Sequence, residues 1–112
     1  MTQKISLLTL SIAAAAALPA ERFLGPNAQL AAAASHAIGV TVSQVTIAGE
    51  LIPYDVLGTT VVTAGAPIAA EALLEVGADG KAVPLAAGIA VARAKQAATA
   101  DGDRIEVLLL PN

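Results

Sequence analysis

The chain has 112 residues, a formal net charge of −3 and no cysteine, and hydrophobic residues make up 56% of it. This length fits one domain; the absence of cysteine excludes disulfides and thiolate metal sites, and six scattered Lys and Arg residues form no basic patch for nucleic-acid binding. With one Phe, one Tyr and no Trp, the core has to be built from Val, Ile and Leu, of which the β-branched pair favours strands.

The first twenty residues have some features of a secretory signal peptide. Lys4 precedes an apolar stretch, and Ala20 ends a passable cleavage site. If residues 1–20 are removed in this way, the chain is a secreted or periplasmic small β-domain binding module, and we keep this alternative open. A transmembrane helix is not expected, because Thr, Ser and Pro interrupt a run that is too short to span a bilayer.

The same segment also has the pattern of a strand. Apolar and polar residues alternate from Leu8 onward, which places Leu8, Leu10 and Ile12 on one face. We therefore predict an extended N-terminal arm or strand over residues 1–12, followed by a single β domain over residues 13–112.

The second half of the chain repeats the first. Glu71 follows Glu21 by 50 residues in a similar setting, and later matches follow at up to 53 residues. The repeat covers about residues 18–57 and 68–109, so cleavage after Ala20 would cut through its first copy. The matched segments are 23–24 with 73–74, 37–40 with 88–91, and 49–52 with 102–105.

The remaining elements are also typical of strands and turns. Residues 50–63 form the longest β region, in which Gly58 predicts a bulge or bend. Residues 77–80 predict a tight hairpin turn, and residues 104–109 predict a last strand. The expected fold is mostly β, a small barrel or sandwich built from two similar β units, with an extended N-terminal segment.

No group of residues predicts catalysis. His36 is the only histidine, and Asp101 and Asp103 flank a glycine in a turn, where carboxylates commonly cap backbone N–H groups. Lys81 follows Gly80, but the other positions of a phosphate-binding loop do not match. We therefore expect no enzyme, no catalytic residue, no cofactor and no metal site.

Short motifs follow one another in an order that covers nearly the whole chain. After an apolar strand and an Ala-rich link they are Ala20-Glu21-Arg22-Phe23-Leu24-Gly25, Ala37-Ile38-Gly39-Val40, Ala48-Gly49-Glu50, Val56-Leu57-Gly58-Thr59-Thr60-Val61, Ala64-Gly65-Ala66-Pro67-Ile68, Ala78-Asp79-Gly80-Lys81, Gly88-Ile89-Ala90-Val91-Ala92, and a final run from Gly102 to Leu109. In this order the chain resembles the small capsid cement, or head decoration, proteins of tailed bacteriophages and prophages. Glu21 and Glu71 depart from the pattern, because these proteins often have Gly there, which leaves the backbone of these two turns open.

The resemblance implies a structural virion protein that binds the outer surface of the major capsid protein lattice and stabilises the expanded head. It implies a homo-oligomer, often a trimer, that resides in the host cytoplasm before assembly and binds neither nucleic acid nor membrane. We expect the apolar N-terminal segment to contact the capsid or a neighbouring subunit. The residues expected in this contact are Ile5, Leu7, Leu8, Leu10 and Ile12.

Overall fold

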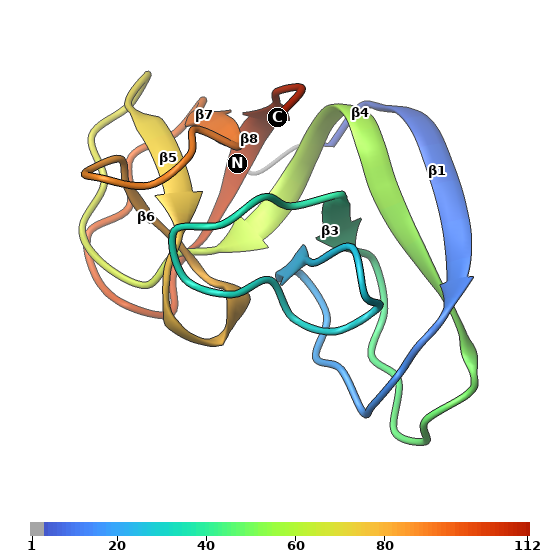
Figure 1. Cartoon of the computed structure of the whole chain (residues 1–112). Helices are drawn as coiled ribbons and strands as arrows, with labels where there is room; N and C mark the ends of the chain where they lie inside the picture. The colour runs from blue at the N-terminus through green and yellow to red at the C-terminus, as the bar shows by residue number, and fades with distance from the viewer. Residues whose placement is uncertain (1–3) are drawn as a thin grey trace.

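A single curled antiparallel sheet contains all the strands of the computed structural model, which describes residues 4–112 (Figure 1). The sheet order is β2-β3-β4-β8-β7-β5-β6, and β1 pairs with β4 outside this path. A short 3₁₀ turn, η1, lies between β5 and β6. The sheet is nearly closed like a barrel, which confirms the expected fold class. The elements are β1 (Ser6–Ala13), β2 (Phe23–Leu24), β3 (Gly39–Thr41), β4 (Leu51–Thr63), β5 (Leu73–Val76), η1 (Ala78–Gly80), β6 (Ala82–Pro84), β7 (Ala92–Ala94) and β8 (Arg104–Leu109).

The long strand β4 belongs to both halves of the molecule. Its first half pairs with β1 and β3, and its second half pairs with β8. Figure 1 shows that β4 bends between its two halves. Gly58 lies where the β1–β4 ladder gives way to the β4–β8 ladder, and a Cβ atom on it would lie 2.3 Å from the carbonyl oxygen of Ile5. Gly58 also has a φ of +93°, which side chains rarely tolerate. The predicted bend at Gly58 is therefore confirmed.

The hydrogen-bonded ladders of the sheet show the same repeat as the sequence. Thr9 lies opposite Asp55 in the β1–β4 ladder, and Thr59 lies opposite Leu108 in the β4–β8 ladder. The same shifts, 50 residues on one strand and 53 on the other, relate every following pair as far as Ala13 with Leu51. Two similar β units are thus present, and the structural repeat includes β1 as well.

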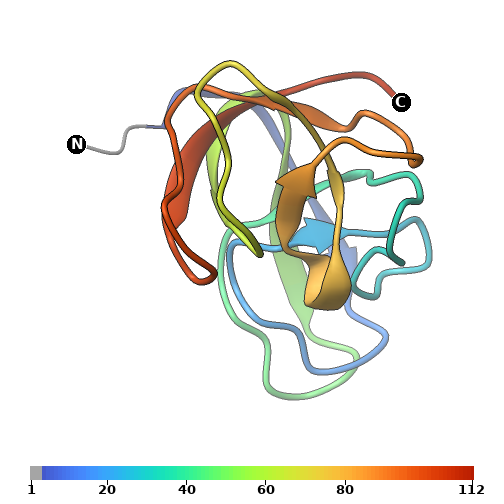
Figure 2. The same ribbon diagram turned by 90° about the vertical axis from the view of Figure 1, so that its left-hand side faces the viewer.

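The short strands are related by the same shifts of 50 and 53 residues. Phe23 lies opposite Val40 in the β2–β3 pair, and Leu73 lies opposite Arg93 in the β5–β7 pair. We call β1, β2, β3 and the first half of β4 unit one, and the second half of β4 with β5 to β8 unit two. Figure 2, which looks onto unit two, shows its strands curling around the interior of the sheet.

One detail of the predicted repeat was wrong. The sequence match paired residues 37–40 with 88–91, whereas the ladders pair them with 90–93. Both segments consist of small and β-branched residues, so a shift of two positions leaves the pattern almost unchanged. The three extra residues of unit two lie earlier in the chain, between β5 and β7, where the β5–β6 hairpin is formed.

Each unit has its own hydrophobic core. In unit one the buried cluster consists of Ala14, Leu18, Leu24, Val45 and Ile52. The equivalent residues of unit two, Ala64, Ile68, Leu74, Ala98 and Ile105, all belong to the second cluster.

The two cores are joined through β2 and β3. Leu24 packs into the core of unit one, but its neighbour Phe23 is fully buried in the core of unit two, together with Val40. Adjacent strand residues point to opposite faces of a sheet, so a two-residue strand serves both cores. Burial of Phe23 contributes about 1.5–3 kcal/mol to this association of the units.

Candidate interaction surface

The polar residues singled out in the sequence lie in loops and turns. Across residues 4–112 no cluster of three or more metal-binding side chains occurs, and no helix in that range is long and apolar enough to span a bilayer. His36 is exposed and lies 3.3 Å from the side-chain oxygen of Asn112. Asp103 accepts hydrogen bonds from the backbone N–H groups of Thr99 and Ala100 and from the Thr99 hydroxyl, which lower its pKa. The predicted capping of a turn by Asp103 is thus confirmed.

The predicted contact residues lie on β1 and just before it. Ile5, Leu7, Leu8 and Leu10 are 57%, 75%, 39% and 44% exposed. Ile12 is half-buried and packs against the core of unit one. Four of the five residues are therefore available to a partner, while the fifth fixes the strand to its own unit. Residues 1–3 of the predicted arm lie outside the described residues, and its separation from the domain at residue 12 stays a prediction.

The apolar surface continues from β1 onto β4, where the sequence did not predict it. Leu57 lies opposite Leu8 and is 45% exposed. The register shifts around Leu8 explain the omission, because period-two alternation assigns faces correctly only in a regular strand. Exposed apolar patches of this kind mark interaction sites on soluble proteins.

A buried carboxylate holds β1 in place. Asp55 is fully buried, and its Oδ2 lies 2.7 Å from Lys4 Nζ and accepts a hydrogen bond from Thr60 at 2.7 Å. Its Oδ1 accepts hydrogen bonds from Ser6 and Thr9 at 2.9 and 2.8 Å. Burial alone raises the pKa of Asp55, but the bonds from Lys4, Thr60, Thr9 and Ser6 outweigh it and lower the pKa.

This cluster has a consequence for the exposed leucines. A buried charge is tolerated when it is paired and hydrogen-bonded, and three of the four partners of Asp55 precede or belong to β1. The N-terminal strand is therefore fixed to β4 by side chains as well as by its ladder. Leu7, Leu8 and Leu10 are presented on a strand whose position is set before any partner binds, which lowers the entropic cost of binding.

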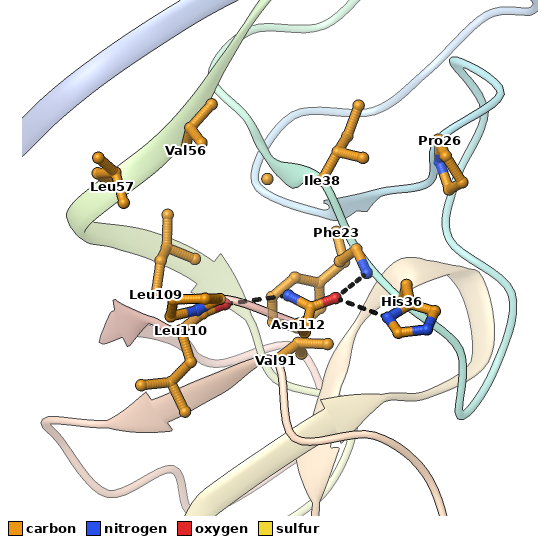
Figure 3. A pocket seen from close by; sticks show the side chains of 13 residues that line it. Phe23, Pro26, His36, Ile38, Val56, Leu57, Val91, Leu109, Leu110 and Asn112 are labelled. Carbon is orange, nitrogen blue, oxygen red and sulfur yellow. Dashed lines mark hydrogen bonds between the residues drawn. The ribbon is translucent and has the colours of Figure 1, made fainter.

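A pocket of about 620 Å³ opens at the junction of the two units (Figure 3). Its wall includes Phe23, Ile38, Leu57, Val91 and Leu109. The side chain of Asn112 lies at this pocket, where its oxygen accepts a hydrogen bond from the backbone N–H of residue 37 at 3.0 Å. Most of the lining is apolar, the side chains of His36 and Asn112 add an imidazole and an amide, and the lining favours packing of an apolar group.

Neither a protein-family model nor a curated protein matches the sequence. Among solved structures, the chain is similar to the crystal structure of the N base of head fiber gp8.5 in bacteriophage phi29. The TM-score is 0.76, the sequence identity is 22%, and the match covers 92% of this chain and 93% of that chain. At this identity the likeness establishes the fold, which the two chains share over nearly their whole length.

Proposed function

We propose that this protein is a structural component of a bacteriophage head. The similarity to the base of a head fiber over 92% of this chain carries the proposal. The sequence motifs support it independently, since their order resembles that of head decoration proteins. The leucine-rich surface of β1 and β4 supplies the kind of exposed apolar patch through which such a protein would attach.

In detail, we propose a capsid cement or decoration protein that binds the outer surface of the major capsid protein lattice and stabilises the expanded head. Many copies that each bind weakly can together hold a pressurised shell. The protein would act as a homo-oligomer, a trimer by the resemblance, on the virion surface after a period in the host cytoplasm. Its partners would be the capsid and its own copies, and neither nucleic acid nor membrane.

A second candidate within the same class is the base of a head fiber. It is favoured by one observation, namely that the similar solved structure is itself such a base. In that case the surface opposite the capsid would carry a further fiber segment. Both candidates require attachment to the head, so one binding experiment tests what they share.

The secreted binding module is less well supported. Cleavage after Ala20 would remove β1 from the sheet and would take Lys4, Ser6 and Thr9 away from the buried Asp55. The remaining chain would keep one of the four side-chain partners of Asp55 and would lose the whole β1–β4 ladder. The mass of the mature protein distinguishes the two alternatives, because retention of residues 4–20 excludes the secreted form.

Co-sedimentation with expanded heads tests the proposal. The heads are assembled from the major capsid protein of the phage or prophage that encodes this chain. We expect the protein to sediment with expanded heads and to leave unexpanded heads unbound. Failure to sediment with either form would overturn the proposal.

A single substitution tests the surface itself. Leu7→Asp replaces a side chain that is 75% exposed, so it leaves the fold intact and should weaken head binding by about tenfold or more. Ile47→Asp is the matched control, because Ile47 is 66% exposed but lies in the loop before β4. Equal binding of the Leu7→Asp variant and the unaltered protein would remove β1 from the capsid contact.

A further inference from the structure

The two units meet inside the chain through two different faces. Unit one contributes Phe23, Val40 and Asp55, which we call the inserting face. Unit two receives them on a face that includes Thr60, on the second half of β4. The contact is fixed by the hydrogen bond from Thr60 Oγ1 to Asp55 Oδ2, 2.7 Å long. The other residues of this receiving face are Val62, Val91 and Val107.

Unit one has the same receiving face, but among the described residues this face is more exposed than its counterpart in unit two. Thr60 in unit two is 2% exposed, whereas its equivalent in unit one, Leu10, is 44% exposed. The other three receiving residues of unit two are at most 1% exposed, and their equivalents are all half-buried. These equivalents are Ile12, Ile38 and Tyr54.

Unit two likewise has an inserting face with nothing to enter. Leu73 and Arg93 take the places of the buried Phe23 and Val40, and both are half-buried. Leu108 takes the place of the fully buried Asp55 and is 36% exposed. One molecule therefore carries an open receiving face on unit one and an open inserting face on unit two.

The two open faces differ from the internal contact at both members of a contacting pair. Inside the chain, Asp55 bonds to Thr60, so a polar group meets a polar group. At the open faces their equivalents are Leu108 and Leu10, so an apolar group would meet an apolar group. A change of both members of one pair keeps the contact complementary.

A second pair changes in the same manner. Val40 and Val107 belong to one buried cluster inside the chain. Their equivalents at the open faces are Arg93 and Tyr54. A guanidinium group stacks favourably on a phenol ring, so this pair also remains complementary.

We propose that the inserting face of one copy docks onto the receiving face of the next copy, repeating the contact between the units. Leu108 of one copy then packs against Leu10 of its neighbour, and Arg93 lies against Tyr54. This inference deepens the homo-oligomer of the proposed function and rests on that part of it alone. Such a head-to-tail contact closes into a ring if its rotation permits, and a trimer would be a ring of six similar units.

A charge-exchange experiment on the free protein tests the contact. Sedimentation velocity across the micromolar range should show the unaltered protein self-associating. Leu10→Lys and Leu108→Asp each place a charge against a leucine, and each should weaken self-association by about tenfold or more. The double variant L10K/L108D pairs the two charges at every contact and should restore most of the lost affinity.

The control is Leu51→Arg, which changes a side chain that is 72% exposed and outside both faces. Its equivalent in unit two is Arg104, so the fold accommodates an arginine there. This variant should associate like the unaltered protein. A monomeric mass of the unaltered protein at all concentrations would overturn the inference, and so would a double variant no better than the single ones. Neither result would affect binding to heads, which is measured separately.

Discussion

Glu21 and Glu71 occupy equivalent turns, and both adopt the left-handed backbone conformation, with φ values of 60° and 68°. The N–H of Glu21 donates to the carbonyl of Thr41, and that of Glu71 donates to the carbonyl of Ala94, each at 2.8 Å. Glycine adopts this conformation without the steric cost that a side chain brings, so glycine would fit both turns better than glutamate does. The structural repeat therefore extends to the strained positions of the backbone.

We predict different effects on stability for two substitutions of Glu71. Glu71→Gly relieves left-handed strain but loses an exposed ion pair with Lys95, so the free energy of unfolding should stay within about 1 kcal/mol of the original. Glu71→Val puts a β-branched residue in the same conformation and should cost roughly 1–2 kcal/mol. Urea denaturation measures both, and Lys95→Ala gives the ion pair's own contribution. A Val variant as stable as the Gly variant would show that this turn does not hold its strained form.

The bend of β4 predicts a difference between two glycines. Gly58 and Gly102 both have positive φ, but a Cβ atom on Gly58 meets backbone atoms of the N-terminal segment, whereas one on Gly102 has no atom within 4 Å. Gly102→Ala should therefore lower the free energy of unfolding by about 1–2 kcal/mol through strain alone. Gly58→Ala should cost clearly more, because β1 has to shift away from β4. Equal thermal stabilities of the two variants would contradict this description of the bend.

The Asp55 cluster predicts a large effect of one isosteric change. Asp55→Asn removes the charge that Lys4 neutralises and places an amide N–H₂ among donors, so it should cost about 2–3 kcal/mol at neutral pH. Asp101→Asn is the control, since Asp101 is 63% exposed and pairs with Lys81 at the surface, where such pairs contribute about 0–1 kcal/mol. If denaturant midpoints place the two variants together, the buried cluster does not hold β1.

The same carboxylate predicts a dependence on pH. The pKa of Asp55 is lower in the folded protein than its ordinary value of 3.8. Its ionised form therefore stabilises the fold above about pH 4, and this contribution disappears as the pH falls through the lowered pKa. The unaltered protein should lose more stability than the Asp55→Asn variant when the pH is lowered from 7 to 3. Parallel losses in the two proteins would assign acid unfolding to other carboxylates.

Much of the fold follows from local patterns in the sequence. Ile105, Val107 and Leu109 alternate with more polar or exposed positions and are buried as such a pattern predicts. Gly58 identified the bend, and the repeated glutamates identified the two units. These signals are local, because alternation and turn residues act within a few positions of the chain.

The features that depend on distant contacts could not be predicted in this way. Asp55 appears as one polar residue in a strand, and its burial depends on Lys4, Ser6, Thr9 and Thr60, which the fold brings together. The exposure of Leu57 depends on a register shift that no local pattern reveals. The open faces of the two units are identified by comparing the burial of equivalent residues, which requires the structure.

The central claim is that the protein attaches to the outside of a phage head, and electron cryomicroscopy of expanded heads saturated with the protein tests it most directly. We predict ordered density on the outer surface of the shell that fits this fold, with β1 and the first half of β4 nearest the capsid protein. Heads that show no such density at a saturating concentration of the protein would contradict the account.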